Sequence, residues 1–180
     1  FARTQYLSRV TDWYSGWEWC RTKKGGGSHL LAAGCHAVDA LRWCSGREVV
    51  EVSAFHTHFT EGYEWPTSIL VNARLDGGAL GHVTSSTDFM LPYNFQVELM
   101  GDRATLRQEL IQSLDGAIDI EALRAANPVP GVTLVPAVDG LGRPAVKIEC
   151  PMPGSADVSH HPFQAEMDEL ITCVLDGRDT

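Results

Sequence analysis

Two histidines and an aspartate lie close together in one mostly apolar stretch of the chain. The stretch reads GGGSHLLAAGCHAVDALRW, from Gly25 to Trp43, and it contains His29, His36 and Asp39. An imidazole exchanges protons near neutral pH, and a carboxylate beside it can fix its tautomer and raise its basicity. The spacing of His36 and Asp39 therefore predicts a general acid–base pair. From the residues alone, the alternative is a buried histidine bonded to the backbone, with Asp39 in solvent.

The same stretch carries the signals of a helix over about residues 29–44. Ser28 suits the N-cap position, and Gly46 suits the left-handed residue that follows a helix. Residues three, four and seven apart share one face of a helix. One expected stripe consists of His29, Ala32, His36, Asp39 and Trp43, and its apolar neighbour consists of Leu30, Ala33, Ala37, Leu41 and Cys44.

Three glycines precede the predicted helix. Glycine allows a ligand to approach the backbone closely, and the free N–H groups at a helix start favour an anionic or oxygen-rich ligand. We therefore expect Gly26 and Gly27 to lie at a bound cofactor. Lys24 is a candidate contact for a cofactor phosphate, and a solvated loop is its alternative.

A second polar segment, SSTDFMLPY (residues 85–93), lies at the end of a predicted strand. Converging donors and acceptors beside an aromatic ring suit a sugar or polyol, so Asp88 and Tyr93 are candidate substrate contacts. An ordinary strand-to-loop transition is the alternative. His56, His58 and His82 raise a further alternative, a metal-dependent hydrolase, but our assignment contains no metal ligand.

The composition limits the classes of function. The formal net charge is −9 and the one basic pair is Lys23–Lys24, which argues against a nucleic-acid or membrane-surface partner. No apolar run approaches the roughly 18 residues that a membrane span needs. The five cysteines are widely spaced without a C-x-x-C pair, which predicts reduced thiols and a cytoplasmic protein.

Segments that read as strands dominate after Gly46. They are EVVEVSAFHTHF, TSILVNARL, ALGHVTSSTDF and NFQVELMG, with a tight turn at Asp76–Gly78, and short strands are expected near 131–136 and 145–150. An amphipathic helix is expected over 162–175. The pattern predicts one α+β domain over 1–180, a large open, predominantly antiparallel mixed β-sheet with helices on one face. An apolar free face would then be buried in a homo-oligomer, a dimer or tetramer.

The glycine-and-histidine stretch resembles the characteristic motif of the Gfo/Idh/MocA oxidoreductases, a glycine triplet followed by G-x-H-x-x-D. Gly25–Gly27, Gly34, His36 and Asp39 match in order and spacing. The segments EVVEV, DGGALGHV and HHPFQAEMDELITCVLDGR are also similar to that family's second domain. The resemblance implies the fold of that domain, which is similar to the C-terminal domain of glyceraldehyde-3-phosphate dehydrogenase. Ala32 stands where the family often has Asp.

The resemblance implies a function as well. The family's helix histidine lies beside the nicotinamide and the hydroxyl being oxidised, which implies a catalytic role for His36 with Asp39 and places Trp19 and Arg21 near a sugar or polyol substrate. NAD or NADP would be bound mainly by an N-terminal Rossmann domain. This chain contains neither the dinucleotide-binding fingerprint G-x-G-x-x-G nor E-K-P, the family's lysine motif in the cofactor domain. We expect the C-terminal domain of an NAD(P)-dependent oxidoreductase, inactive alone. A non-catalytic sugar-binding or dimerisation module is the alternative.

Overall fold

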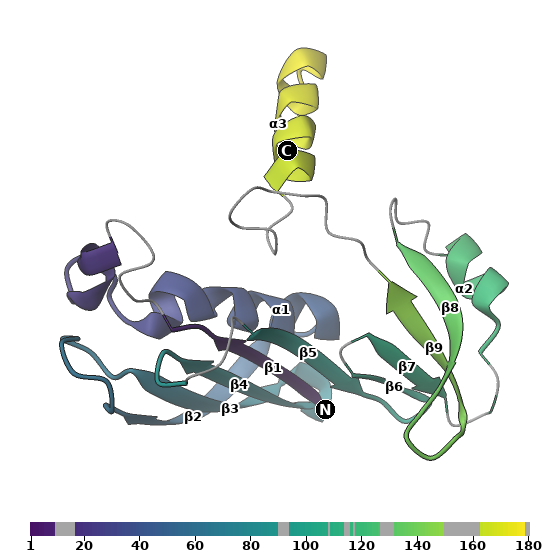
Figure 1. Cartoon of the computed structure of the whole chain (residues 1–180), viewed down its shortest axis with the longest axis horizontal. Helices are drawn as coiled ribbons and strands as arrows, with labels where there is room; N and C mark the ends of the chain where they lie inside the picture. The colour runs from purple at the N-terminus through teal and green to yellow at the C-terminus, as the bar shows by residue number, and fades with distance from the viewer. Residues whose placement is uncertain are drawn as a thin grey trace.

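The computed structural model describes residues 1–9, 17–89, 94–107, 109–113, 116, 118–126, 132–149 and 163–178. Within these ranges, nine strands form one sheet in the order β2-β3-β4-β1-β5-β6-β7-β9-β8 (Figure 1). The strands are β1 (Ala2–Leu7), β2 (Val49–Thr57), β3 (Ser68–Leu75), β4 (Leu80–Ser86), β5 (Asn94–Met100), β6 (Ala104–Arg107), β7 (Leu110–Ser113), β8 (Thr133–Val138) and β9 (Pro144–Glu149).

In the described part of the chain, three α-helices and three short turns of other helix types accompany the sheet. They are α1 (Cys35–Ser45), α2 (Ile120–Ala126), α3 (Phe163–Asp176), the 3₁₀ turns η1 (Trp17–Arg21) and η3 (Asp76–Gly78), and the π-helical turn η2 (Leu30–Gly34). Helix α2, which lies beside β8 (Figure 1), was not expected from the sequence. Among the described helices, none has the length and apolar content needed to cross a bilayer.

The sheet confirms the expected α+β class but departs from a simple meander at β1. This strand lies between β4 and β5, parallel to β4 and antiparallel to β5, whereas the other neighbouring strands are antiparallel. The expected tight turn joins β3 to β4, and its Gly77 and Gly78 have φ values of 66° and 84°. The strand from the N-terminus therefore pairs with the free edge of β4. Hydrophobic period shows that a strand exists but not which strands lie beside it.

Helix α1 covers one face of the sheet over β1, β4 and β5 (Figure 1). Thr4 of β1 is buried, and its hydroxyl donates to the Ala37 carbonyl oxygen at 2.7 Å. The core beneath the helix consists of Ala2, Tyr6, Ala37, Leu41, Ala73, Leu75 and Val83. This packing determines which side of α1 faces the sheet, and hence which side is left exposed.

The opposite face of the same strands presents mainly polar side chains. By the strand register they include Arg3, Gln5, Asn72, Arg74, His82, Thr84, Gln96 and Glu98. The His82 ring contacts Asn72 Oδ1 and Thr84 Oγ1, each at 3.0 Å. Leu70 and Leu80 are the exposed apolar members on β3 and β4. The apolar alternation that we expected on this face is therefore present only in part.

Gly34 lies against Ser85 of β4 where the helix crosses the sheet. A Cβ atom at Gly34 would lie 2.2 Å from Ser85 Oγ and 2.7 Å from Ser85 Cβ. Ser85 is fully buried, so it has little room to move aside. The missing side chain of Gly34 therefore sets the depth at which the helix packs on β4.

Replacing Gly34 by alanine is expected to destabilise the protein by about 1–3 kcal/mol, the usual cost of overpacking a core. At an uncrowded helix position the same change stabilises by about 0.5–1 kcal/mol, so the sign of the effect is diagnostic. Gly140→Ala is the control, because nothing lies within 4 Å of a Cβ atom there. Urea unfolding at pH 7 measures both variants. An unchanged or higher unfolding free energy for Gly34→Ala would contradict the packing described.

Candidate active site

His36 and Asp39 lie on the exposed side of α1, one helical turn apart. The His36 ring stacks on Tyr6 of β1, with 5.7 Å between the ring centroids and 28° between the ring planes. Tyr6 is itself buried under the helix. The imidazole is thus accessible on one side and supported on the other. A direct interaction of His36 with Asp39 stays a prediction.

His29 does not share the exposed side of the helix, which corrects the stripe expected above. Its side chain is buried, with 3% of the residue exposed. The reason is the π-helical turn over Leu30–Gly34, which bonds i to i+5 and so contains an extra residue. Side chains before the turn are rotated relative to those after it. Ala37 and Leu41, which follow the turn, are buried as the apolar stripe predicts.

Two serines hold the buried imidazole of His29. Its Nδ1 lies 2.7 Å from Ser85 Oγ, and its Nε2 lies 3.0 Å from Ser8 Oγ. The rings of Tyr6 and Trp65 lie at centroid distances of 6.1 and 6.4 Å. Burial lowers the pKa of His29 to about 4, because the imidazolium form would lose its hydration there. At pH 7 His29 is therefore a neutral bridge between the end of β1 and β4.

The glycine loop begins the helix as predicted. Ser28 Oγ accepts a hydrogen bond from the Leu31 backbone N–H at 3.1 Å, which confirms the N-cap. Gly27 has a φ of 72°, and a Cβ atom at Gly26 would lie 2.3 Å from the Cys20 carbonyl oxygen. The backbone conformation at Gly27 and the close contact at Gly26 therefore each explain why a glycine is required there. Their contact with a cofactor stays a prediction.

Arg21 connects η1 with the loop between β2 and β3. Its Nε donates to the Gly62 carbonyl oxygen at 2.7 Å, and its guanidinium carbon lies 5.4 Å from the centre of the Tyr63 ring, a cation–π distance. Trp19, by contrast, is 54% exposed, and Lys24 is exposed as well. The substrate and cofactor contacts proposed for these three side chains stay predictions.

Asp88 is surrounded by donors from its own chain. Oδ1 accepts from the N–H and the hydroxyl of Thr60 at 3.1 and 2.7 Å, and Oδ2 accepts from the hydroxyls of Thr67, at 2.9 Å, and Ser68. Burial raises the pKa of the Asp88 carboxyl, but these hydrogen bonds outweigh burial and keep the pKa below its usual value. The residue therefore ties a loop to the sheet. Tyr93, its predicted companion, lies outside the described residues.

The histidines of the metal alternative do not come together. His56 pairs with Ile69 and His82 pairs with Asn72, so the two histidines point to opposite faces of the sheet. Among the residues that the structure describes, no three His, Cys, Asp or Glu side chains are grouped as a metal site. Cys35, Cys44 and Cys173, in the same part of the chain, are free thiols.

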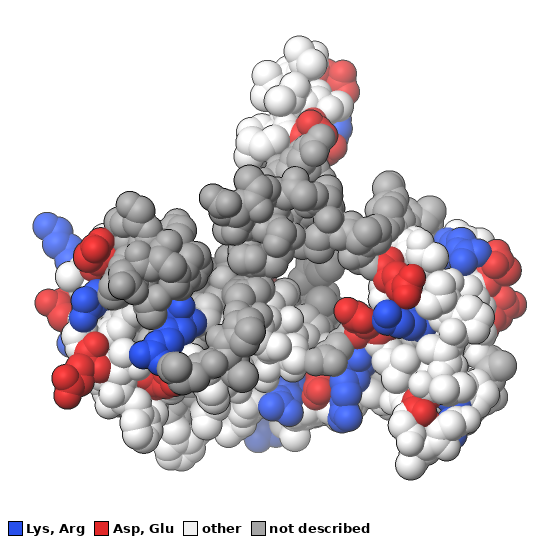
Figure 2. All heavy atoms as spheres, in the orientation of Figure 1, with Lys and Arg blue, Asp and Glu red and all other residues white. Residues whose placement is uncertain are grey.

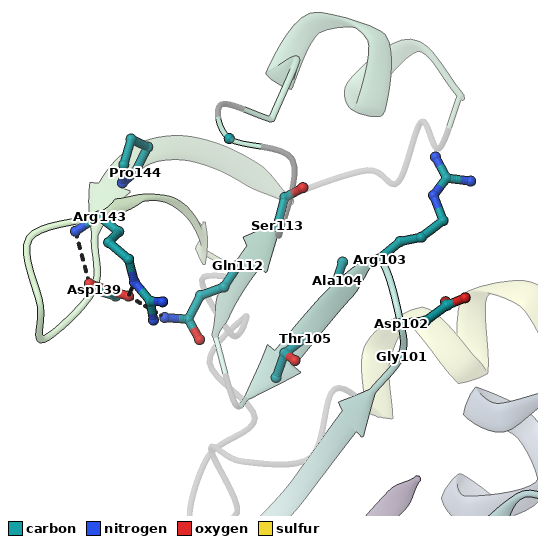
Figure 3. A pocket seen from close by; sticks show the side chains of 11 residues that line it. Gly101, Asp102, Arg103, Ala104, Thr105, Gln112, Ser113, Asp139, Arg143 and Pro144 are labelled. Carbon is teal, nitrogen blue, oxygen red and sulfur yellow. Dashed lines mark hydrogen bonds and ion pairs between the residues drawn. The ribbon is translucent and has the colours of Figure 1, made fainter.

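A cavity of about 370 Å³ lies at the other end of the sheet (Figure 3). It is lined by the β5–β6 turn, the end of β7 and the β8–β9 hairpin. Figure 3 shows Gln112 and Arg143 pointing toward Asp139, which accepts from both at 2.8 and 2.6 Å. Figure 2 shows acidic and basic side chains interspersed over the visible face. The cavity contains none of the predicted site residues.

The sequence of this chain matches a known protein family. The sequence model of the GFO/IDH/MocA C-terminal domain matches residues 2–107, from β1 through β6. The chain belongs to this family. Residues 2–107 of this family member include the glycine loop, both histidines and the helix that carries His36. A search of curated proteins gives no match.

Solved dehydrogenases share the fold of this GFO/IDH/MocA chain. Scyllo-inositol dehydrogenase from Lactobacillus casei, with bound NAD(H) and scyllo-inositol, has a TM-score of 0.58 and 16% identity over 99% of this chain and 47% of its own. Aldose-aldose oxidoreductase from Caulobacter crescentus, complexed with glycerol, has a TM-score of 0.61 and 19% identity over 99% of this chain and 46% of its own. Levoglucosan dehydrogenase, in complex with NADH and levoglucosan, has a TM-score of 0.65 and 16% identity over 99% of this chain and 50% of its own. The chain thus spans half or less of each of these proteins, and the likeness confirms the expected fold.

The residues that hold the two histidine rings were not foreseen from the sequence. Tyr6, Ser8 and Ser85 were not assigned to either ring, because they come from β1 and β4, whose pairing the sequence does not reveal. One signal was available. Ser85 alternates with Val83 and Gly81 along β4, so a polar side chain occupies the buried face of an otherwise apolar strand.

The stability of the protein is expected to fall between about pH 6.5 and pH 4 because of His29. The unfolded chain binds a proton near pH 6.5, whereas the folded protein binds it near pH 4, so acid favours the unfolded state in this window. The full difference amounts to about 3 kcal/mol. Urea unfolding at pH 7 and pH 4.5 measures it. His29→Gln, which has no titrating ring, is the control, and the same loss of stability in both proteins would refute the assignment.

Proposed function

We propose that this chain is the C-terminal, substrate-binding domain of an NAD(P)-dependent oxidoreductase that acts on a hydroxyl of a sugar or polyol. The position of His36 carries this proposal. Its imidazole is exposed on the outer side of α1 and is stacked on the ring of Tyr6. A general acid–base must be accessible to the substrate and held in one orientation, and His36 meets both conditions.

In this proposal His36 exchanges a proton with the substrate hydroxyl as the attached carbon is oxidised or reduced. NAD or NADP, when bound, supplies the hydride acceptor or donor. Asp39, one turn further along α1, orients the imidazole. Substrate contacts are assigned to Trp19, Arg21, Asp88 and Tyr93.

The glycine loop fits contact with an anionic part of the cofactor. Lys24 is exposed and Gly27 is partly exposed, at the start of a helix whose first N–H groups carry partial positive charge. Gly26 is buried on η1, so its part is to set the path of the loop. Most of the cofactor would be bound by a separate Rossmann domain.

The ligands of the structural neighbours support a hydroxyl-rich substrate. Structures with scyllo-inositol, glycerol and levoglucosan share this fold. All three ligands carry several hydroxyl groups, which require polar contacts around the reacting one. The same ligand class would also suit the alternative, a sugar-binding module without redox activity.

In the protein that combines this chain with its cofactor domain, His36→Ala is expected to lower kcat at least 10²-fold, because general acid–base catalysis typically contributes that much. The unfolding midpoint should hardly change, because the side chain is exposed. NAD(P) reduction with a panel of sugars and polyols measures turnover. His58→Ala, another exposed histidine, should leave both quantities unchanged. Sugar binding without any NAD(P) reduction would favour the non-catalytic module, and full activity of His36→Ala would refute the catalytic assignment.

The face of the sheet opposite helix α1 is the proposed surface for a homo-oligomer. Its apolar members Phe55 and Leu70 lie opposite each other on β2 and β3 and are 70% and 45% exposed. Leu80 adds a third exposed apolar side chain, beside polar groups that can pair across an interface. An open sheet face of this kind is stabilised when a second copy covers it.

Leu70→Glu is expected to convert an oligomer into a monomer, because it would place a charge within the proposed interface between the copies. Light scattering during size exclusion measures the mass of each species. Leu141→Glu is the matched control, since Leu141 is 79% exposed in the distant β8–β9 turn and should leave the mass unchanged. A monomeric unmodified protein would contradict this proposed surface.

A further inference from the structure

One tyrosine connects the buried histidine with the exposed one. The ring of Tyr6 lies 6.1 Å from that of His29, at 59°, and 5.7 Å from that of His36, at 28°. Both distances fall within the range in which aromatic rings attract each other. The orientation of His36 therefore depends on Tyr6, and Tyr6 is in contact with His29.

We infer that His29 is the positioning residue of this site and acts on His36 through Tyr6. The inference rests on the proposed function, in which His36 is the acid–base group. His29 itself is too deeply buried to touch a substrate. Its contribution is to fix the surface on which His36 rests.

The strand register shows how His29 does this. Tyr6 of β1 lies directly opposite Ser85 of β4, and Ser8 follows two residues after Tyr6. The backbone N–H of Ser8 donates to the Ser86 carbonyl oxygen at 3.0 Å, so Ser8 continues the pairing of the two strands. His29 bonds to Ser8 and Ser85 and therefore bridges the end of β1 and β4 beside Tyr6.

The bridge is specific because His29 is neutral. A neutral imidazole has one N–H donor and one acceptor nitrogen, so one serine hydroxyl accepts from the ring while the other donates to it. Both ring edges are thereby fixed. An apolar side chain of similar volume would fill the same space but leave both serine hydroxyls without this partner, and the hydroxyl of Ser85, which is fully buried, would be left unpaired away from water.

The first test follows His36 directly and requires no catalytic activity. In His29→Leu, the NMR signals of the His36 ring should lose the shift caused by the Tyr6 ring and move toward those of a free histidine. In His29→Gln, which keeps an amide donor and an acceptor, they should stay near their original positions. Ser8→Ala removes one of the two bonds at the end of a strand and should give an intermediate shift, which serves if His29→Leu does not fold. Ser45→Ala removes a serine hydroxyl at the far end of α1 and is the control.

Turnover provides the second readout. In the protein with its cofactor domain, His29→Leu should lower kcat about tenfold with little change in KM, because a misplaced acid–base group slows chemistry more than binding. His29→Gln should recover most of the loss. A simple packing defect would not be rescued by glutamine in this way.

The two proposals fail in different ways. Unchanged His36 signals in folded His29→Leu and Ser8→Ala would overturn the positioning role, whatever the activity. Full turnover of His36→Ala would overturn the proposed function and leave the NMR result standing. Loss of activity in His29→Leu without rescue by His29→Gln would also overturn the positioning role.

Discussion

The contact between Gly34 and Ser85 determines how the candidate active site is assembled. Because Gly34 has no side chain, the helix packs close enough to β4 for the Ser85 hydroxyl to lie 2.7 Å from the His29 ring. Tyr6 lies opposite Ser85 in the sheet and supports the His36 ring. One close approach of backbone to side chain thus sets the positions of both histidines. Any group that widened this contact would shift them together.

The two histidines show how environment separates the roles of one residue type. A single π-helical turn between them directs His29 inward and leaves His36 outward. Burial removes the water that would stabilise a charged His29, so this ring remains a neutral hydrogen-bonding group at physiological pH. His36 retains access to solvent and, in the proposed function, to a substrate. A fixed neutral ring and an accessible ring are complementary parts of one site.

Much of the fold could be predicted from the sequence, because local signals determine it. The Ser28 cap, the left-handed Gly46 after α1 and the Asp76–Gly78 turn all appear as expected. The position of β1 between β4 and β5 could not be predicted, since alternation does not specify a neighbour. The burial of His29 was missed for a related reason. The spacing rule assumes a regular α-helix, and the residue types in this stretch do not indicate a π-helical turn.

The candidate ligand contacts differ in how much bonding capacity they have left. The carboxylate of Asp88 accepts four hydrogen bonds from its own chain, which fills its acceptor positions, and Arg21 is bonded to Gly62. A substrate hydroxyl would gain little by displacing such partners, because each exchange replaces one good hydrogen bond by another. Trp19 and His36, by contrast, are exposed. In the proposed enzyme, Trp19 and His36 therefore offer an aromatic surface and an imidazole without such an exchange, whereas a substrate contact at Asp88 requires one.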